Sequence, residues 1–204
     1  SLSSIFNQEQ SVNSGFAVDV WRPNHFDTGK DAFTHLPVGN IFTGINVDVA
    51  VRDVDAWILR VGYNVTLLGK IVFLAVPETL FKSNFDATPD NAPPATVQAV
   101  GTAKVDGPAG SVIVIDPTFI HTHKWLQIKE PTGFDARGFV GELTKAGGGG
   151  IYNFSAELFL PSGSVSLNNV VTISFEAPGA QEFFHIDFLP QPENQVRIDD
   201  NATT

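Results

Sequence analysis

Cysteine is absent from all 204 residues of the chain. Its absence excludes disulfide scaffolds, zinc knuckles and thiolate nucleophiles, and it argues against a small secreted module held together by disulfides. A chain of this length buries about 70% of the surface that its unfolded form exposes, so it needs neither disulfides nor a structural metal. We therefore expect the fold to depend on one large apolar core.

Methionine is absent as well. Because translation starts at methionine, we expect the chain to be a processed product; removal of the initiator, an engineered start and release from a precursor all account for Ser1. No apolar run approaches the roughly 18 residues that a transmembrane helix needs, and the first ten residues, SLSSIFNQEQ, are largely polar. The sequence therefore predicts neither a retained signal peptide nor membrane insertion.

Basic residues are few and scattered. The chain has 12 Lys and Arg against 22 Asp and Glu, which gives a net charge of −10, and the first basic residue is Arg22. Such an acidic surface repels the negatively charged phosphate backbone. An arm that binds nucleic acid also needs several Lys or Arg side chains to replace counterions. We expect any contact with nucleic acid to be weak.

Phenylalanine, by contrast, is abundant, with 17 Phe against 3 Trp and 2 Tyr, and it predicts a wide, dry core. From Ile41 onward, apolar and polar residues alternate, and clusters of Gly, Pro, Asn and Asp separate the runs, as in an antiparallel sandwich or barrel. The predicted strands are residues 44–51, 56–63, 69–76, 96–100, 111–115, 124–128, 138–143, 151–160, 170–175 and 183–189. The predicted core residues are Val47, Val49, Ile58, Val72, Leu74, Phe159, Ile173 and Phe188.

Two segments interrupt the strand pattern. Residues 77–95 are polar and rich in proline, so they predict a long loop, which a short helix at 78–82 could begin. Four consecutive glycines at 147–150 predict a hairpin tip or a linker. A domain boundary there is the alternative, but the strand pattern resumes at Ile151, which favours one domain.

Residues 63–81, YNVTLLGKIVFLAVPETLF, resemble the shell domain of calicivirus coat proteins. The segments AVGTAKVDGPAGSVIVIDP, NFSAELFLPSG, NNVVTISFEA and EFFHIDFLPQP follow in the order of the later strands of that shell. More distantly, they are similar to the small coat proteins of picorna-like viruses. The resemblance extends over residues 41–192 in total, without the protruding domain of caliciviruses.

This resemblance implies an all-β fold, an eight-stranded antiparallel jelly-roll β-sandwich with an extended N-terminal arm. Its expected parts are an arm with loops at 1–40, a shell domain at 41–192 and a tail at 193–204. The implied function is that of a structural capsid protein without enzymatic activity. It would assemble with copies or related subunits into an icosahedral virion in the host cytoplasm, enclose RNA that it contacts weakly, and meet a host receptor. Release from a viral polyprotein fits the absence of methionine.

The first 21 residues are apolar and slightly acidic, which suits a segment that lies in a groove of a neighbouring subunit better than one that coats phosphates. We expect this arm to be ordered between subunits. The residues expected to make these inter-subunit contacts are Leu2, Ile5, Phe6, Phe16, Val18 and Trp21.

Only one motif suggests a transition metal. In His121-Thr122-His123, two alternate residues of a strand can reach one ion, as in the cupin enzymes, but Glu130 lies farther along the chain than the cupin pattern requires. We expect no metal and no cofactor there. Asp53, Asp55, Asp86 and Asp90 are candidate Ca²⁺ ligands or, more simply, solvated turn carboxylates. The sequence has no G-x-S-x-G or phosphate-loop motif, so nothing in it predicts a nucleophile.

A secreted carbohydrate-binding β-sandwich is the competing interpretation. The acidic charge, the long loops and an exposed Trp21, Trp57 or Trp125 would suffice for such a module. Glycosylation acceptor triplets begin at Asn64, Asn153 and Asn201, although the first two fall on or beside predicted strands, where a glycan would meet another sheet.

Overall fold

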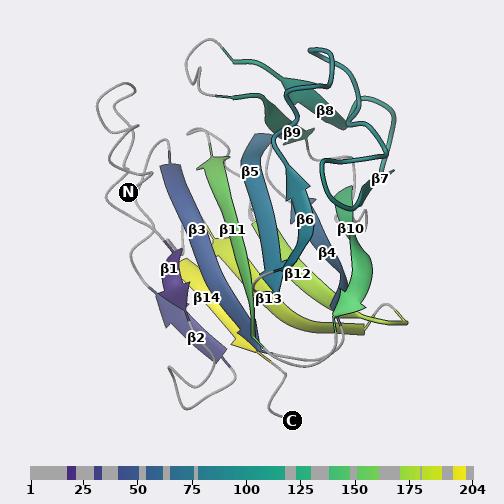
Figure 1. Ribbon diagram of the computed structural model, residues 1–204. Coiled ribbons are helices and arrows are strands. Elements are labelled where there is room, and N and C mark those ends of the chain that lie inside the picture. Colours follow the sequence, from purple (N-terminus) through teal and green to yellow (C-terminus); the bar gives the residue numbers. More distant parts are fainter. Residues whose placement is uncertain are drawn as a thin grey trace.

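The computed structural model describes residues 18–21, 30–33, 41–50, 54–61, 65–75, 78–117, 123–129, 138–147, 151–160, 171–179, 181–189 and 195–200. In this part of the chain every regular element is a β-strand, so the all-β prediction is confirmed. The strands form two seven-stranded sheets that lie face to face (Figure 1). The described residues include no helix long and apolar enough to cross a membrane.

The first sheet, sheet A, has the order β1-β3-β11-β5-β9-β8, with β6 also paired to β5. All its neighbours are antiparallel except β1, which runs parallel to β3. The strand β5 is long enough to pair with β9 along its first part and with β6 along its second part. The bounds are β1 Val18–Trp21, β3 Ile41–Ala50, β5 Val65–Ala75, β6 Glu78–Ser83, β8 Val112–Ile115, β9 Trp125–Lys129 and β11 Ile151–Leu160.

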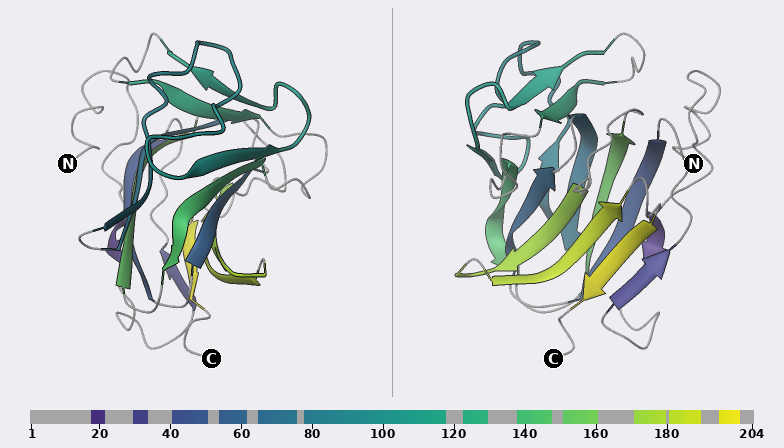
Figure 2. Two further views of the ribbon diagram at one scale, coloured as in Figure 1. Left: turned by 45° about the vertical axis from the view of Figure 1, so that its right-hand side comes forward. Right: turned by 180° about the vertical axis from the view of Figure 1, so that it is seen from behind.

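The second sheet, sheet B, is antiparallel throughout, with the order β2-β14-β13-β12-β4-β10-β7. Seen from behind in Figure 2, the strands from the C-terminal part of the chain lie side by side, with β2 next to β14. The bounds are β2 Lys30–Phe33, β4 Val54–Val61, β7 Thr102–Asp106, β10 Gly138–Gly147, β12 Val171–Ala177, β13 Gln181–Leu189 and β14 Gln195–Asp200.

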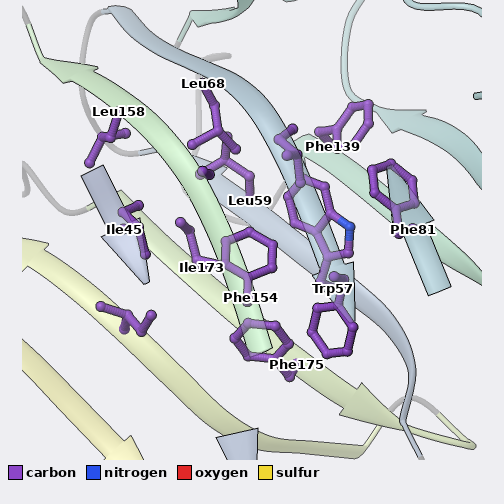
Figure 3. Packing of buried hydrophobic residues seen from close by; sticks show 14 of the residues in the cluster. Ile45, Trp57, Leu59, Leu68, Phe81, Phe139, Phe154, Leu158, Ile173 and Phe175 are labelled. Carbon is purple, nitrogen blue, oxygen red and sulfur yellow. The ribbon is translucent and has the colours of Figure 1, made fainter. Parts of the chain in front are cut away.

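An aromatic cluster joins the two sheets. Phe154 of β11 lies 5.4 Å from Trp57 of β4 and 5.3 Å from Phe175 of β12, measured between ring centroids (Figure 3). Phe73 of β5 lies 5.3 Å from the same Phe175. All four side chains are fully buried. Burial of each large apolar side chain stabilises the fold by roughly 1.5–3 kcal/mol, so these aromatic residues contribute a large share of the core's stability.

The predicted core residues are confirmed in part. Val47, Ile58, Ile173 and Phe188 have no exposed surface, and Phe159 is 3% exposed. Ile58, however, belongs to a separate apolar cluster with Ala56 and Val140, because alternation places it on the face of β4 opposite Trp57. Val72 and Leu74 are only partly buried, and the side chain of Val49 lies outside the described residues.

Residues 78–82 do not form the predicted helix. They belong to β6, which is antiparallel to β5. The pairing skips Leu80, which lies between the paired Thr79 and Phe81, so the strand contains a bulge. The bulge buries Leu80 and Phe81 together and removes the alternation that would have identified a strand.

Two other expectations need correction. Residues 96–100 form a turn with isolated bridges, Val97 to Thr102 and Val100 to Lys82, and the strand β7 begins only after Gly101, whose φ of +83° suits glycine. Of the two readings of the glycine-rich segment, the hairpin tip is wrong, because β10 lies in sheet B and β11 in sheet A, and the linker remains.

The sheets are wider than the two four-stranded sheets of an eight-stranded jelly roll. Part of the extra width comes from segments expected to be an arm and a tail. The strands β1 and β2 fall within residues 1–40, and β14 falls within residues 193–204. Since β2 pairs with β14, these two segments lie together at one edge of sheet B.

Candidate functional site

A histidine, a glutamate and a lysine meet on the outer face of sheet A. Ala156 and Leu158 of β11 point into the core between the sheets, so alternation directs Glu157 to the opposite face. The side chain of Glu157 nevertheless has no exposed surface, and that of His123 is only 3% exposed. Charged groups at such depth are rare unless they are paired, which makes this group, the His123 cluster, the strongest candidate site.

Both ring nitrogens of His123 have hydrogen-bond partners. The ring atom Nδ1 of His123 lies 2.7 Å from the carbonyl oxygen of Lys124, which can only accept, so Nδ1 must carry a proton. The other nitrogen, Nε2, lies 2.7 Å from Oε2 of Glu157. Lys70 Nζ lies 3.3 Å from Oε1 of the same carboxylate. The imidazole of His123 thus lies between a carbonyl oxygen and a carboxyl group that also faces the ammonium of Lys70.

The backbone makes room for this pair. Gly69 of β5 lies directly across from Glu157 in the ladder, and a Cβ atom at Gly69 would overlap the imidazole of His123. The indole of Trp125 covers the same ring, with centroids 4.3 Å apart and planes inclined by 31°. Next to Gly69, Lys70 has a φ of 45°, at the register shift between β5 and β11. This bulge places the ammonium beside Glu157.

The chemistry open to the His123 cluster is limited by its own bonds. A general base needs a free ring nitrogen that can take a proton from a substrate. Here Nδ1 is bonded to Lys124 and Nε2 to Glu157, so neither ring nitrogen is free. The described residues contain no group of three His, Cys, Asp or Glu side chains that could hold a metal ion. The cluster attaches the segment around His123 to β5 and β11 by buried polar contacts.

A second histidine cluster, the His185 network, lies on the outer face of sheet B. Phe184 and Ile186 point into the core, so His185 points outward. Its Nδ1 lies 2.9 Å from Oε1 of Glu182, and its Nε2 lies 3.5 Å from Oδ2 of Asp187. These side chains are partly exposed, at 22% for His185, 33% for Glu182 and 14% for Asp187.

Two arginines and two hydroxyl groups complete the His185 network. Arg60 Nη1 donates to Glu182 Oε2 at 2.9 Å and to Ser174 Oγ at 3.2 Å. Thr172 Oγ1 donates to Asp187 Oδ1 at 2.7 Å, and Arg197 Nη2 lies 3.8 Å from Asp187. The network therefore neutralises both of its carboxylates from several strands of sheet B.

These contacts shift three pKa values. Hydrogen bonding to Asp187 and then to Glu182 raises the pKa of His185 from 6.5 to about 10. The hydrogen bond with His185, supported by Arg60, lowers the pKa of Glu182 from 4.5 to about 2. Burial alone would raise the pKa of Asp187, but hydrogen bonds from His185 and Thr172 lower it below its ordinary value. The His185 network is therefore an array of charges near neutral pH.

The residues proposed as metal ligands can be placed only in part. His123 bonds Glu157, while His121 and Glu130 lie outside the described residues. Asp86 and Asp90 accept backbone N–H groups, from Lys124 at 3.1 Å and from Asp116 at 2.8 Å, and so they hold the proline-rich loop in place. Among the other candidates, Asp53 is not described and Asp55 is partly buried on β4.

The residues expected to contact other subunits can be placed only in part. Leu2, Ile5, Phe6 and Phe16 lie outside the described residues. Val18 and Trp21 belong to β1, where their Cα atoms pair with Ile45 and Val47 of β3. Nothing is described of their side chains, so the inter-subunit contact stays a prediction.

The tryptophans bear on carbohydrate binding. Trp57 and Trp125 have no exposed surface, so neither can stack on a sugar. The side chain of Trp21 lies outside the described residues. Of the three acceptor triplets, that of Asn153 lies within β11, where the asparagine amide donates to Asn46 of β3. Asn64 and Asn201 are not described.

Glu157, Gly69 and Lys70 were not identified from the sequence. The signal that points to Glu157 is its place in AELFLP, where a single acid stands in a run that is apolar on both faces. A charge in such a run needs a buried partner. The sequence does not name that partner, because His123 lies 34 residues away.

Comparisons with models of protein families, with curated proteins and with solved structures find no match to this chain.

Proposed function

We propose that this chain is a structural capsid protein, a subunit of jelly-roll type that assembles with copies or related subunits into an icosahedral virion shell around an RNA genome. The observation that carries the proposal is the coincidence of two features. The segments that resemble viral shell domains, within residues 41–192, supply most strands of the two sheets. Those sheets pack face to face on an aromatic core, which is the layer arrangement of a shell domain.

The polar groups of the described residues support a structural role. In each histidine cluster the polar side chains pair with one another. Neither cluster offers a free base beside a nucleophile. The net charge of −10 fits a shell that holds its RNA with few direct contacts. Under this proposal the N-terminal arm lies between subunits in the virion, and it makes contacts through Leu2, Ile5, Phe6, Phe16, Val18 and Trp21.

The carbohydrate-binding alternative is weaker. It needs exposed aromatic rings on which a sugar can stack, and two of the three tryptophans are fully buried. No observation on the described residues favours it over the capsid proposal.

The test is the size of the assembled protein. We expect the purified chain to form closed particles, far larger than a monomer, in light scattering and negative-stain electron microscopy over a series of pH and salt conditions. Deletion of residues 1–16 should weaken these particles while circular dichroism still reports a folded β protein. A chain that stays monomeric in every condition, and that binds a glycan instead, would overturn the proposal. RNA binding with a steep salt dependence would contradict the role given to the arm.

A further inference from the structure

The edge strands β8 of sheet A and β7 of sheet B differ in how far their outer backbone groups are hydrogen-bonded. The strand β8, at one edge of sheet A, is covered by the proline-rich loop: Asn91 N donates to Val114 O at 2.8 Å and Val114 N donates to Ala92 O at 2.7 Å. Among the described residues, the strand β7, at one edge of sheet B, is covered only at its start, where Ala103 N donates to Thr96 O at 2.7 Å. Beyond Ala103 no described residue continues this pairing.

The backbone geometry shows which groups are left open on β7. Ala103 directs its N–H away from β10, and alternate residues of a strand direct their backbone groups to the same side. The N–H and C=O of Val105 therefore also point away from β10. The covering segment cannot extend to Val105 as a regular ladder, because Pro93 and Pro94 have no N–H to donate.

The side chains around this open edge are unusual for a surface. Among the described residues, the exposed large hydrophobic side chains are Val97, at 75%, and Val105, at 36%. Val97 is bridged to Thr102 at the start of β7, so both flank the same edge. Lys104 and Asp106 are exposed on either side of Val105. An open edge with apolar and charged side chains is a ready template for another strand.

The edge is complementary to itself. If two copies of β7 pair antiparallel with Val105 opposite Val105, each Lys104 lies opposite an Asp106 of the other copy. The outward N–H and C=O of Val105 then form the hydrogen-bonded pair on the two-fold axis. Symmetric registers centred one residue away would place Lys104 opposite Lys104 or Asp106 opposite Asp106. The charges and the outward direction of the Val105 backbone groups therefore both favour the register centred on Val105.

We propose that the open edge of β7 is a two-fold contact between two copies of this chain, across which sheet B continues from one subunit into the next. The contact is isologous, since the same surface serves both partners. It deepens the proposed function, on which its use in a shell rests, by naming one contact through which copies associate. A dimer can nevertheless form whether or not a shell does.

The absence of cysteine allows a direct test on the full chain. A cysteine introduced as Val105→Cys would lie on the two-fold axis, where paired Cα atoms are about 5.5 Å apart, within reach of a disulfide. We expect mild oxidation to give a covalent dimer at micromolar concentration. The control is Val97→Cys, which is more exposed but off the axis and should give at least tenfold less dimer. Equal cross-linking of the two variants, or none at Val105, overturns the contact.

Charge reversal tests the register in solution. Lys104→Asp places like charges opposite each other and should weaken the dimer at least tenfold in sedimentation equilibrium, whereas Lys104→Asp combined with Asp106→Lys should restore it. Arg197→Asp, on β14, is the control and should leave the dimer unchanged, with circular dichroism confirming that each variant is folded. Particles that form unaltered in the Lys104→Asp variant contradict the contact but not the capsid proposal. Dimers without particles support the contact and contradict the capsid proposal.

Discussion

The His123 cluster and the His185 network place similar side chains in opposite surroundings, on the outer faces of the two sheets. His123 and Glu157 are almost completely buried and depend on one lysine for additional charge. His185 shares two partly exposed carboxylates with two arginines. The pair of His123 and Glu157 is removed from water and has few other polar partners, whereas the His185 network has several polar partners and some contact with water.

This difference separates two roles for an ion pair. A buried pair contributes little net stability compared with apolar residues of similar size, but removal of one partner leaves an unpaired charge in a region without water. An exposed pair is screened, so the loss of one partner costs little, and its effect is seen mainly as a dependence on pH. The His123 cluster should therefore control stability, and the His185 network should control how stability varies with pH.

The largest effect should follow from removal of the buried carboxylate. We expect Glu157→Ala to reduce the free energy of unfolding by about 3–5 kcal/mol, because it leaves the buried His123 without its partner. The matched variant Glu182→Ala, in the partly exposed network, should cost about 1 kcal/mol or less. Urea denaturation followed by circular dichroism measures both. Equal losses would show that burial does not distinguish the two clusters.

The next effect concerns the space that Gly69 leaves for the imidazole. Gly69→Ala should reduce the free energy of unfolding by about 1–3 kcal/mol, because the new methyl group overlaps the ring of His123. When the ring is removed by His123→Ala, the same glycine substitution should cost much less. A double-mutant cycle in urea measures this coupling. Additive losses would mean that the glycine serves some other purpose.

Sequence reasoning predicted the parts of the fold that alternate. The long strands β3, β4 and β11 were expected nearly where they occur, since each presents one row of apolar side chains to the other sheet. It failed where alternation is broken, as at the bulge of Leu80, and in the short strands β1, β2 and β14, whose pairing partners are distant in sequence. A short edge strand is defined by the strand it pairs with, and that information is not local.

The candidate site was predictable only in part. The His-Thr-His motif marks His123 only as a possible metal ligand, a role that the position of Glu130 argues against. Its partner Glu157 depends on the pairing of β5 with β11, and the room for its ring depends on Gly69 across the ladder. Such a contact is a product of strand register, which the chain specifies only once all the strands are assembled.

The pH dependence of stability should come from the His185 network. Because the folded pKa of His185, about 10, exceeds its ordinary value of 6.5, its contribution is complete below about pH 6.5 and is lost as the pH rises to about 10. Because the pKa of Glu182 falls from 4.5 to about 2, its contribution is complete above pH 4.5 and is lost as the pH falls toward 2. We therefore expect a stability maximum between about pH 4.5 and 6.5 from this network.

His185→Gln tests this assignment. After allowance for solvent screening, it should remove about 1–2 kcal/mol of stability at pH 6 and much less at pH 10, which flattens the alkaline part of the curve. Chemical denaturation at a series of pH values measures the curve, and the NMR signals of the imidazole should report a protonated His185 at pH 8. A ring that titrates near 6.5 would contradict the network geometry.

The smallest effect is expected from the loss of a partly exposed cation, and it can be compared at Lys70 and Arg197, which have nearly equal exposure. Lys70 is 51% exposed and lies 3.3 Å from the fully buried Glu157, and Arg197 is 50% exposed and lies 3.8 Å from Asp187, which is 14% exposed. Glutamine keeps the Cβ atom at both positions, so Lys70→Gln does not relieve the strain of the 45° φ angle. We expect Lys70→Gln to cost about 1 kcal/mol and Arg197→Gln less than about 0.5 kcal/mol, because only Lys70 faces a carboxylate without water. Added salt should reduce the Arg197 effect more than the Lys70 effect, since exposed pairs are screened more strongly than partly buried ones. If the two variants lose equal stability with equal salt dependence in urea denaturation, the exposure of the cation rather than the burial of its partner decides the strength of these pairs.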